Sequence, residues 1–449
     1  METKKEGFPA AFWVCACTEI FERLAYYLGR SLILIFVTAS VATGGLGLSD
    51  TVAANMQSNL TAFSYLLPLF GAVIVDKYIG ARYTTPVGMF IAAAGYFTGG
   101  IAKSSAGVYA MIFLVSLGLA LFKNGAIIGR VITDKSQMDP AFSMRYTLVN
   151  VGAFIGTFLV GIRYKDVFAK DGVLGFAPCF KMAALMMVLG GLWYIFVCWR
   201  FLGDLGKLPF KKTLTEEEKA AEAKKKEETG TKQPLTTIEK KRIGAIFVAS
   251  LFSIVFWIFW YLGYMPVYFY WAENMDWVVA GYQVPSTWFD AANSLFCVIL
   301  GPVTAALWKK LAARPQGDMS LFRKTGLGIA IIGVGYLFYA AIDIMRGGEK
   351  ASVLWLIVFA FLLTMGEMFF SPLGHSFISK YSPSRYLAVM MSVWGFATFI
   401  AAKSYGPVYG LLFGGKIEFK VACIGVAVVS FAAALIMIAL DKTLSALVD

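Results

Sequence analysis

A short stretch near the start of the chain carries acidic, basic and aromatic side chains at a spacing that could handle protons. Glu19, Glu22 and Arg23 stand close together in a chain of 449 residues that is only 15% charged. At about 100° per residue, these positions fall with Tyr26 and Arg30 on one face of an α-helix. We expect Glu19 and Arg23 to pair at i,i+4, with Glu22 sharing the same guanidinium. One carboxylate could then exchange a proton; the alternative is a purely structural ion network.

Two further charges lie alone inside apolar stretches of opposite halves of the chain, Lys123 and Glu367. A charge at the centre of a membrane span costs about 2.5–3.5 kcal/mol on insertion scales, so it needs a partner or water. We expect the two to pair across a central cavity, where a breakable bridge could act as a gate. The alternative is that each pairs within its own half.

The composition places these charges in a membrane. The chain is 58% hydrophobic and 16% aromatic, whereas ordinary globular domains carry roughly 45–50% apolar and about 25% charged residues. Its apolar runs are near the length of about 20 residues that spans a bilayer. The sequence therefore predicts an all-α membrane protein with twelve transmembrane helices. They are expected at residues 10–38, 50–75, 82–101, 105–132, 143–163, 174–200, 242–271, 283–308, 322–345, 351–378, 386–413 and 418–440.

The net charge of +12 is concentrated in the gaps between the apolar runs, as in proteins whose basic loops fix their orientation in the membrane. We therefore expect no nucleic acid as a partner. An even number of spans and the side of the basic loops predict that both termini are cytoplasmic. The six cysteines stand singly and there is one histidine, so we expect no metal, no cofactor and no enzyme activity.

The charged segment 203–241 divides the chain into two predicted six-helix bundles, residues 1–202 and 242–449. We interpret it as a cytoplasmic linker that acts as a plain tether; the alternative is a regulatory role. The stretches 71–82 and 301–314 are weakly similar, each a small-residue helix end followed by a basic loop. Two parallel six-helix repeats of this kind place a substrate site at mid-membrane between the halves, and alternating access follows from rocking one half against the other. The residues thus predict a carrier of a small polar solute.

At the first helix the sequence resembles a known family. The run Glu19-Ile-Phe-Glu22-Arg23-Leu-Ala-Tyr26-Tyr27 is similar to the E-x-x-E-R-F-x-Y-Y motif of the proton-dependent oligopeptide transporters, with Leu24 in place of the phenylalanine. This family is part of the major facilitator superfamily. Four further stretches are similar to the family's motifs. They are the basic loop at residues 71–82, the lysine at 123, the Asn-x-Gly sequence at 150–152, and the stretch 366–394, which contains Glu367 and Pro372.

The resemblance implies the major facilitator fold and proton-coupled symport of di- and tripeptides or peptide-like solutes. It assigns proton coupling to Glu19, Glu22 and Arg23. It also implies a set of residues that contact the substrate: Tyr26, Arg30, Lys123, Asn150, Asn293, Glu367 and Trp394. In that arrangement Lys123 and Arg30 face a peptide carboxylate, and Glu367 faces the amino group. From the residues alone, the asparagines could equally be packing contacts between helices.

One departure makes this a divergent relative. Where the family carries an acid in its seventh helix, this chain has Tyr261. That acid is expected to pair with the first-helix arginine to close the outer gate, so Arg30 needs another partner, for which we predict Asp290. The alternative function is therefore transport of a non-peptide small molecule, by uptake or by export. The remaining expected partners are protons and the lipid bilayer, for a monomer in the plasma or inner membrane.

Overall fold

The computed structural model describes residues 7–132, 137–209, 235–315, 317, 319–383 and 386–448. Most of the predicted linker 203–241 therefore lies outside the described residues. The chain forms two compact units. Unit 1 comprises Met1–Leu48 and Leu66–Leu214, and unit 2 comprises Ser49–Tyr65 and Thr215–Asp449.

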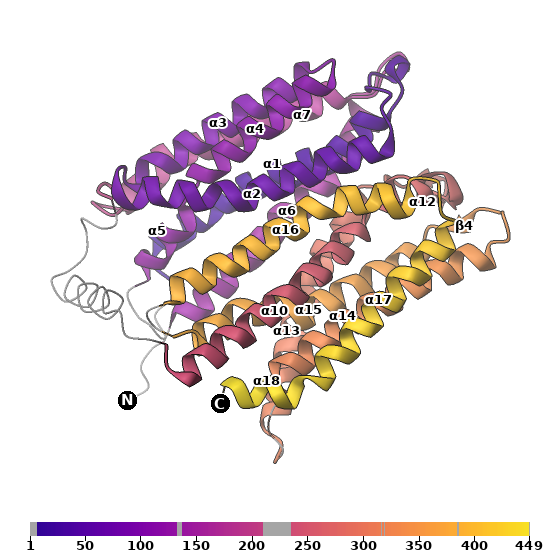
Figure 1. The fold of residues 1–449 in the computed structure, drawn as a ribbon. Helices are drawn as coiled ribbons and strands as arrows, with labels where there is room; N and C mark the ends of the chain where they lie inside the picture. The colour runs from indigo at the N-terminus through magenta and orange to yellow at the C-terminus, as the bar shows by residue number, and fades with distance from the viewer. Residues whose placement is uncertain are drawn as a thin grey trace. The chain divides into compact units, whose positions relative to one another are not determined.

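Unit 1 is helical throughout its described part apart from loops and one isolated β-bridge. Its α-helices are α1 (Ala10–Thr38), the later part of α2 (Asp50–Lys77), α3 (Ala81–Ile101), α4 (Ser105–Leu121), α5 (Asn124–Val131), α6 (Met138–Ile162), α7 (Phe176–Trp193) and α8 (Trp199–Phe201). A 3₁₀ turn, η1, and two π-helical turns, η3 and η4, occupy Val41–Thr43, Arg163–Val167 and Tyr194–Cys198. Helix α1 packs against α6 and α7, and α3, α4 and α7 lie side by side (Figure 1).

Glycines at these contacts bring the helix backbones together. A Cβ atom on Gly118 of α4 would stand 2.4 Å from the carbonyl oxygen of Gly88 in α3. One on Gly156 of α6 would stand 2.4 Å from the carbonyl oxygen of Leu24 in α1. Such small-residue contacts are typical of helices that pack within a membrane.

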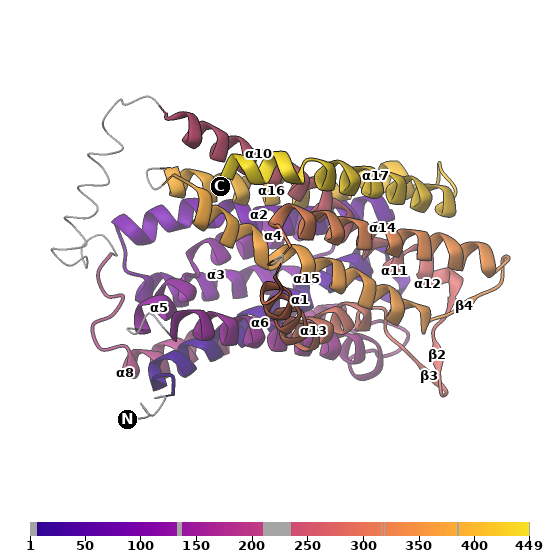
Figure 2. The same cartoon turned by 90° about the horizontal axis from the view of Figure 1, so that it is seen from below.

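Unit 2 contains the first part of α2 and most of the later helices. These are α10 (Thr237–Leu262), α11 (Met265–Tyr268), α12 (Tyr270–Asn274), α13 (Trp288–Ala312), α14 (Leu321–Met345), α15 (Trp355–Tyr381), α16 (Leu387–Phe413), α17 (Phe419–Ala439) and α18 (Asp441–Val448). Helix α14 packs against both α15 and α17, and α10 packs against α16 (Figure 2).

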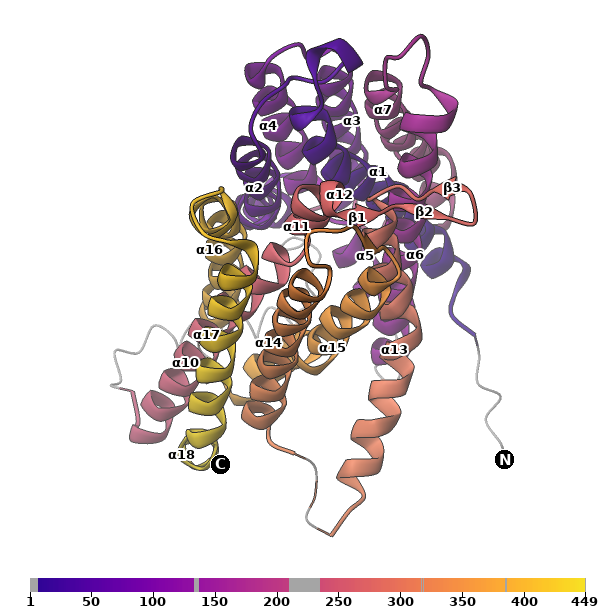
Figure 3. The same cartoon turned by 90° about the vertical axis from the view of Figure 1, so that its right-hand side faces the viewer.

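Four two-residue strands stand at one end of the helices of unit 2: β1 (Met275–Asp276), β2 (Val278–Val279), β3 (Tyr282–Gln283) and β4 (Ala351–Ser352). Strands β1 and β4 pair in parallel, with Met275 opposite Ala351, while β2 and β3 form an antiparallel hairpin (Figure 3). Ala280 and Gly281 take positive φ values at the hairpin turn, a backbone that a two-residue hairpin loop requires.

Eight helices in the described part of the chain are long and apolar enough to cross a membrane. They lie at Asp50–Val75, Ser105–Val131, Pro140–Val167, Phe176–Phe201, Thr237–Asn274, Trp288–Ala312, Leu321–Met345 and Phe419–Ala439. Only 33–50% of each apolar window is buried inside the protein, so at least half of each window is left for other surroundings, as expected of helices in contact with lipid. The prediction of an all-α, multi-pass membrane protein is confirmed.

The predicted spans match helices of the structure closely, with two interruptions that the periodicity did not reveal. The span expected at 105–132 is divided into α4 and α5, because Lys123 leaves the helical conformation with φ −121° and ψ 31°. The span expected at 242–271 ends as a regular helix at Leu262, where Gly263 caps α10 and Pro266 starts the short α11. Proline is tolerated in the first turn of a helix, but in a helix interior it removes a backbone hydrogen bond and kinks or ends the helix.

Candidate functional site

The first pair of the candidate site lies wholly within α1. The guanidinium of Arg23 holds both carboxylate oxygens of Glu22, donating from Nε to Oε2 and from Nη2 to Oε1. The side chain of Glu22 is 0% exposed and that of Arg23 is 25% exposed. Burial deprives this carboxylate of hydration, and the hydrogen bonds from the Arg23 guanidinium replace part of what is lost.

The second acid of α1 has a different cation. Glu19 accepts from Nε of Arg145 in α6 at 3.0 Å and from the side-chain amide of Asn124 at 3.1 Å. The expected i,i+4 pair of Glu19 with Arg23 is therefore wrong, and the two carboxylates do not share one guanidinium. The reason is tertiary packing, since α6 brings a second arginine to α1 that local spacing cannot reveal. Asn124 and Arg145 are thus members of the network that the sequence did not identify.

The tyrosine and arginine that follow on α1 are also buried. Tyr26 is 6% exposed, and the guanidinium of Arg23 lies over its ring at 4.9 Å. Arg30 is 4% exposed and lies over the ring of Tyr27 at 6.0 Å. Both guanidinium groups are thus held against aromatic faces by cation–π attraction, and for Arg23 this adds to its ion pair with Glu22.

Lys123 stands at the interruption between α4 and α5, and not in the interior of a continuous helix as predicted. Its Nζ donates to the carbonyl oxygen of Pro68 in α2 at 2.8 Å. On α6, the side-chain amide of Asn150 donates to the carbonyl oxygen of Tyr146 at 3.0 Å, one turn earlier in the same helix. Both residues belong to unit 1 with the α1 network.

In unit 2, Glu367 of α15 is 8% exposed and lies against α13. The amide nitrogen of Asn293 donates to Oγ1 of Thr364 at 2.8 Å and to Oε2 of Glu367 at 3.2 Å. Cys297, one turn further along α13, contacts the same carboxylate oxygen at 3.7 Å. The structure thus brings two predicted site residues, Asn293 and Glu367, into direct contact.

Trp394 of α16 is 7% exposed, and its ring stacks on Phe370 of α15 with centroids 6.0 Å apart. Gly374 leaves room for that indole, because a Cβ there would meet Trp394 at 2.1 Å. Asp290, at the start of α13, accepts a hydrogen bond from the hydroxyl of Tyr268 in α11. The two predicted pairs, Lys123 with Glu367 and Arg30 with Asp290, join residues of different units and stay predictions.

Tyr261 takes part in a cluster of hydroxyl groups. Its O–H donates to the hydroxyl of Tyr65 in α2 at 3.2 Å, and its ring stacks on Tyr405 of α16 with centroids 5.0 Å apart. Tyr261 is 4% exposed and Tyr405 is fully buried. The sequence drew attention to Tyr261 as a departure from a family pattern, but nothing in it pointed to these two partners.

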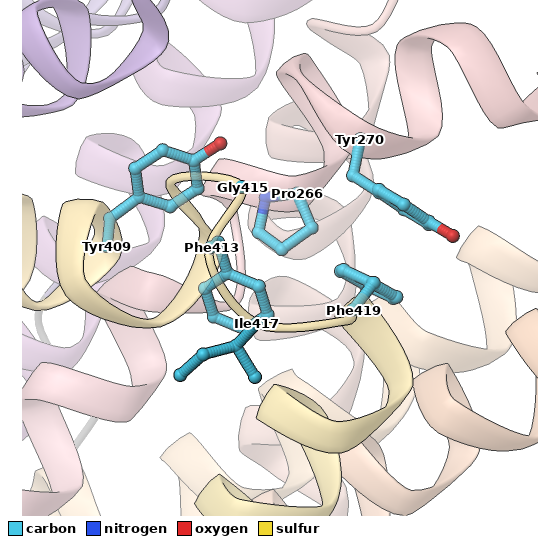
Figure 4. Close-up of a pocket in the computed structure, with 7 residues that line it drawn as sticks. All are labelled: Pro266, Tyr270, Tyr409, Phe413, Gly415, Ile417 and Phe419. Atoms are coloured by element: carbon cyan, nitrogen blue, oxygen red, sulfur yellow. The ribbon is translucent and has the colours of Figure 1, made fainter.

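A separate cavity of about 130 Å³ lies at the end of α16 in unit 2 (Figure 4). It is lined by Pro266, Tyr270, Tyr409, Phe413, Gly415, Ile417 and Phe419. This set includes none of the predicted site residues, and its walls are mostly aromatic and aliphatic. Among the residues that the structure describes, no three His, Cys, Asp or Glu side chains are grouped so that they could hold a metal ion.

Comparison with known proteins points to one class. A family model described as the POT family matches residues 206–413. The chain is 24% identical to an uncharacterized transporter, YclF, of Bacillus subtilis over 89% of this chain and 87% of that protein. It is 24% identical to a di-/tripeptide transporter of Lactococcus lactis subsp. cremoris, covering 86% of each chain. Its fold matches a crystal structure of the peptide transporter POT with sulfate at a TM-score of 0.86 and 23% identity, over 99% of this chain and 98% of that one.

Proposed function

We propose that this chain, a member of the proton-dependent oligopeptide transporter (POT) family, is a secondary active transporter that carries di- and tripeptides together with protons. The observation that carries the proposal is the fully buried Glu22, held at both oxygens by Arg23 in a motif that resembles the family's. A buried acid with one breakable partner can change its protonation when the partner leaves, and this couples proton movement to conformation.

The proposal includes twelve spans in two six-helix bundles, residues 1–202 and 242–449, joined by the linker 203–241. Eight helices meet the criteria of length and hydropathy. Four more, α1, α3, α15 and α16, contain 29, 21, 27 and 27 residues. A helix of about 20 residues is about 30 Å long, the thickness of the apolar bilayer core. Together, these two groups of helices give the twelve proposed spans.

Proton coupling is assigned to the α1 network. When Glu22 takes up a proton, its attraction for the guanidinium falls, and Arg23 is released toward the transport path. When Arg23 returns, it favours the ionised carboxylate, and the proton leaves. Glu19, which Arg145 and Asn124 hold in place, is assigned to the same proton-coupling network.

Substrate binding is assigned to buried or partly buried side chains of both units. A peptide zwitterion needs opposite charges held apart, so Lys123 and Arg30 are proposed to bind its carboxylate and Glu367 its amino group. Asn293 orients the Glu367 carboxylate, because its amide donates to Oε2 at 3.2 Å. Further contacts are assigned to Tyr26, Asn150 and Trp394, which are at most 9% exposed.

Gating is assigned to pairs that form and break during the cycle, Lys123 with Glu367 and Arg30 with Asp290. If Arg30 closes the outer gate on Asp290, replacing Asp290 with Asn will weaken outward closure. Unchanged labelling of cysteine probes on the outer side in that variant would rule out the pairing. The protein is placed in the inner or plasma membrane as a monomer, in contact with lipid, with both termini cytoplasmic.

The alternative, a non-peptide substrate carried by export, is not favoured. Similar proteins include two Lactococcus lactis di-/tripeptide transporters and the peptide transporter YePEPT of Yersinia enterocolitica. One structure of the same fold is described as a complex with 5-aminolevulinic acid, a molecule that resembles a small peptide in its amino and carboxylate ends.

The test is transport by the purified protein in liposomes with an imposed pH gradient and membrane potential, alkaline and negative inside. We expect di-alanine to accumulate against its concentration gradient, and a protonophore to abolish the accumulation. Parallel vesicles receive amino acids, nucleosides and sugars as competing candidates. Accumulation of one of these without any di-alanine uptake would contradict the proposal and support the alternative.

A further inference from the structure

The β2–β3 hairpin, which lies between α12 and α13, presents apolar side chains and carries no charge. No Asp, Glu, Lys, Arg or His stands between Asp276 and Asp290. At the tip, Val278, Val279 and Tyr282 are 52%, 36% and 38% exposed. A single exposed apolar residue is ordinary on a protein surface, but here three of them stand together on an uncharged segment. The hairpin therefore exposes a small apolar surface.

Two other loops at the same end of unit 2 are charged. The loop 346–350 holds two basic residues and one acidic residue, and the loop 414–418 holds one of each. The first loop stands at this end because β4, which follows it, pairs with β1. The second does so because its residues line a cavity together with Tyr270 of α12. Of these three loops, only the hairpin lacks the charges that are typical of a segment in water.

Contacts at its base fix the hairpin on the neighbouring helices. The indole nitrogen of Trp277 donates to the carbonyl oxygen of Trp271 at 2.9 Å, and the main-chain nitrogen of Val284 donates to the carbonyl oxygen of Trp277 at 2.7 Å. The ring of Tyr282 lies 5.8 Å from that of Trp288, the first residue of α13. The position of the tip is therefore set by the helices that carry it.

The direction of the hairpin differs from that of the helices. In Figures 2 and 3, β2 and β3 run across the direction of the helices of unit 2. Helix α13 is long and apolar enough to cross a membrane. A segment that runs across such a helix at its end lies along the membrane surface.

We propose that the β2–β3 hairpin docks in the lipid headgroup region of the bilayer and anchors this end of unit 2 there. Tryptophan and tyrosine are enriched at membrane–water interfaces, because their rings are apolar and carry a polar group. Trp277, Tyr282 and Trp288 bring three such rings to the hairpin and its base. The absence of charge removes the cost that a carboxylate or ammonium group would meet near lipid.

The backbone of the hairpin limits how deep it can lie. Strands β2 and β3 pair only with each other, so the outer edge of each strand stays outside any sheet. The hydrocarbon core offers no partner for unpaired N–H and C=O groups, whereas headgroups and their water do. The contact is therefore with the headgroup region and not with the hydrocarbon core.

Fluorescence quenching in liposomes tests this placement. An environment-sensitive fluorophore is attached to Val279→Cys in the full chain, with the six native cysteines replaced. The matched control is Glu349→Cys, in the charged loop at the same end of unit 2. The quenchers are lipids brominated near the headgroup, lipids brominated near the chain ends, and iodide on both sides of the membrane.

We expect the label at position 279 to emit at shorter wavelength than the label at 349, and to lose most intensity with lipid brominated near the headgroup. Iodide should quench it less than the control. Iodide quenching equal to that of the control would place the hairpin in water and overturn the proposal. Stronger quenching by the deeper bromine would place it in the hydrocarbon core, and shielding from all three quenchers would mean that protein covers it; either result also overturns the proposal.

A second variant tests whether apolar character holds the hairpin at the lipid. Val278→Asp adds a charge beside the label at position 279, and Val278→Thr keeps the shape without the charge. We expect the aspartate to shift the emission to longer wavelength and reduce quenching by the shallow bromine, while the threonine leaves both unchanged. If the aspartate also leaves both unchanged, the proposal is wrong. Neither measurement needs a substrate, so its outcome is independent of the proposed peptide transport.

Discussion

In unit 2, the first part of α2, with the fully buried Ser58, contacts α16 and Tyr261, and we call this contact the α2–α16 seam. The α1 network of unit 1 and this seam both bury polar groups, but with opposite chemistry. In the network, Glu19 and Glu22 are at most 2% exposed, and each is held by an arginine. In the seam, hydroxyl, amide and carbonyl groups bond to one another. Breaking a buried ion pair leaves an uncompensated charge, at a cost of about 3–5 kcal/mol. Losing one neutral hydrogen bond costs only about 1 kcal/mol.

The difference teaches that the two regions suit different tasks. Charged pairs respond to protons, because protonation removes one of the charges. Neutral pairs do not respond to protons, but they open and close with small free-energy changes. Proton coupling is therefore assigned to the α1 network and not to the seam, and substitutions that change the bonding of either region test this comparison.

The largest expected effect is the loss of proton coupling in Glu22→Gln. The amide keeps the shape of the side chain but can no longer take up and release a proton. We expect accumulation of di-alanine driven by the pH gradient to disappear, while counterflow exchange between equal pH values continues. Both are measured in the same liposome preparation.

The matched control is Glu349→Gln, since Glu349 lies exposed in the loop after α14 and should keep full accumulation. If Glu22→Gln still accumulates di-alanine, another group carries the proton. The assignment of proton coupling to the α1 network would then be wrong.

The next effect is a loss of stability in Arg145→Gln, which leaves the Glu19 carboxylate without its guanidinium. Because Arg145 is 30% exposed, we expect about 3 kcal/mol, the lower end of the cost of breaking a buried pair. Thermal unfolding in detergent measures it. The double variant Glu19→Gln/Arg145→Gln should recover most of the loss, and Arg314→Gln, at an exposed arginine, is the control. Equal losses in single and double variants would show that charge is not the cause.

A smaller effect is expected in the seam for Tyr405→Phe. The variant keeps the buried ring but removes the hydroxyl that donates to Gln57 and lies beside Thr61. A loss of about 1 kcal/mol corresponds to roughly fivefold faster maleimide labelling of Ser58→Cys. A labelling rate as low as in the parent would mean that the hydroxyl does not hold the seam closed.

The smallest effect is expected for Tyr261→Phe. Its hydroxyl partner Tyr65 is 42% exposed, so water can replace the lost bond, and the stacking on Tyr405 remains. We expect labelling of Ser58→Cys to rise about twofold or less. An increase larger than that of Tyr405→Phe would reverse the order and make Tyr261 the principal closing residue.

Much of the fold followed from the sequence, because hydropathy and helix length are local properties. The span predicted at 10–38 coincides with α1, and that predicted at 386–413 begins one residue before α16. The interruptions at Lys123 and Gly263 were missed, since apolar periodicity continues across them. A glycine followed by Pro266 was the available signal for the second.

The sequence predicted which residues belong to the candidate site better than it predicted the contacts between them. The unusual cost of a charge in a membrane span identified Glu22 and Glu367, both of which are buried. Their contacts depend on which helices pack together, so the sequence could not assign Arg145 to Glu19 or Asn293 to Glu367. Apart from Tyr261, the residues of the seam were not predicted, because hydroxyl and amide groups are common in membrane helices and carry no charge.

Helix α2 contains Pro68, only a few residues after the point where its contacts pass from unit 2 to unit 1. Proline removes the backbone hydrogen bond to the residue four positions earlier, which makes a helix easier to bend at that turn. The turn at which α2 bends most easily thus lies beside the point where it passes from one unit to the other.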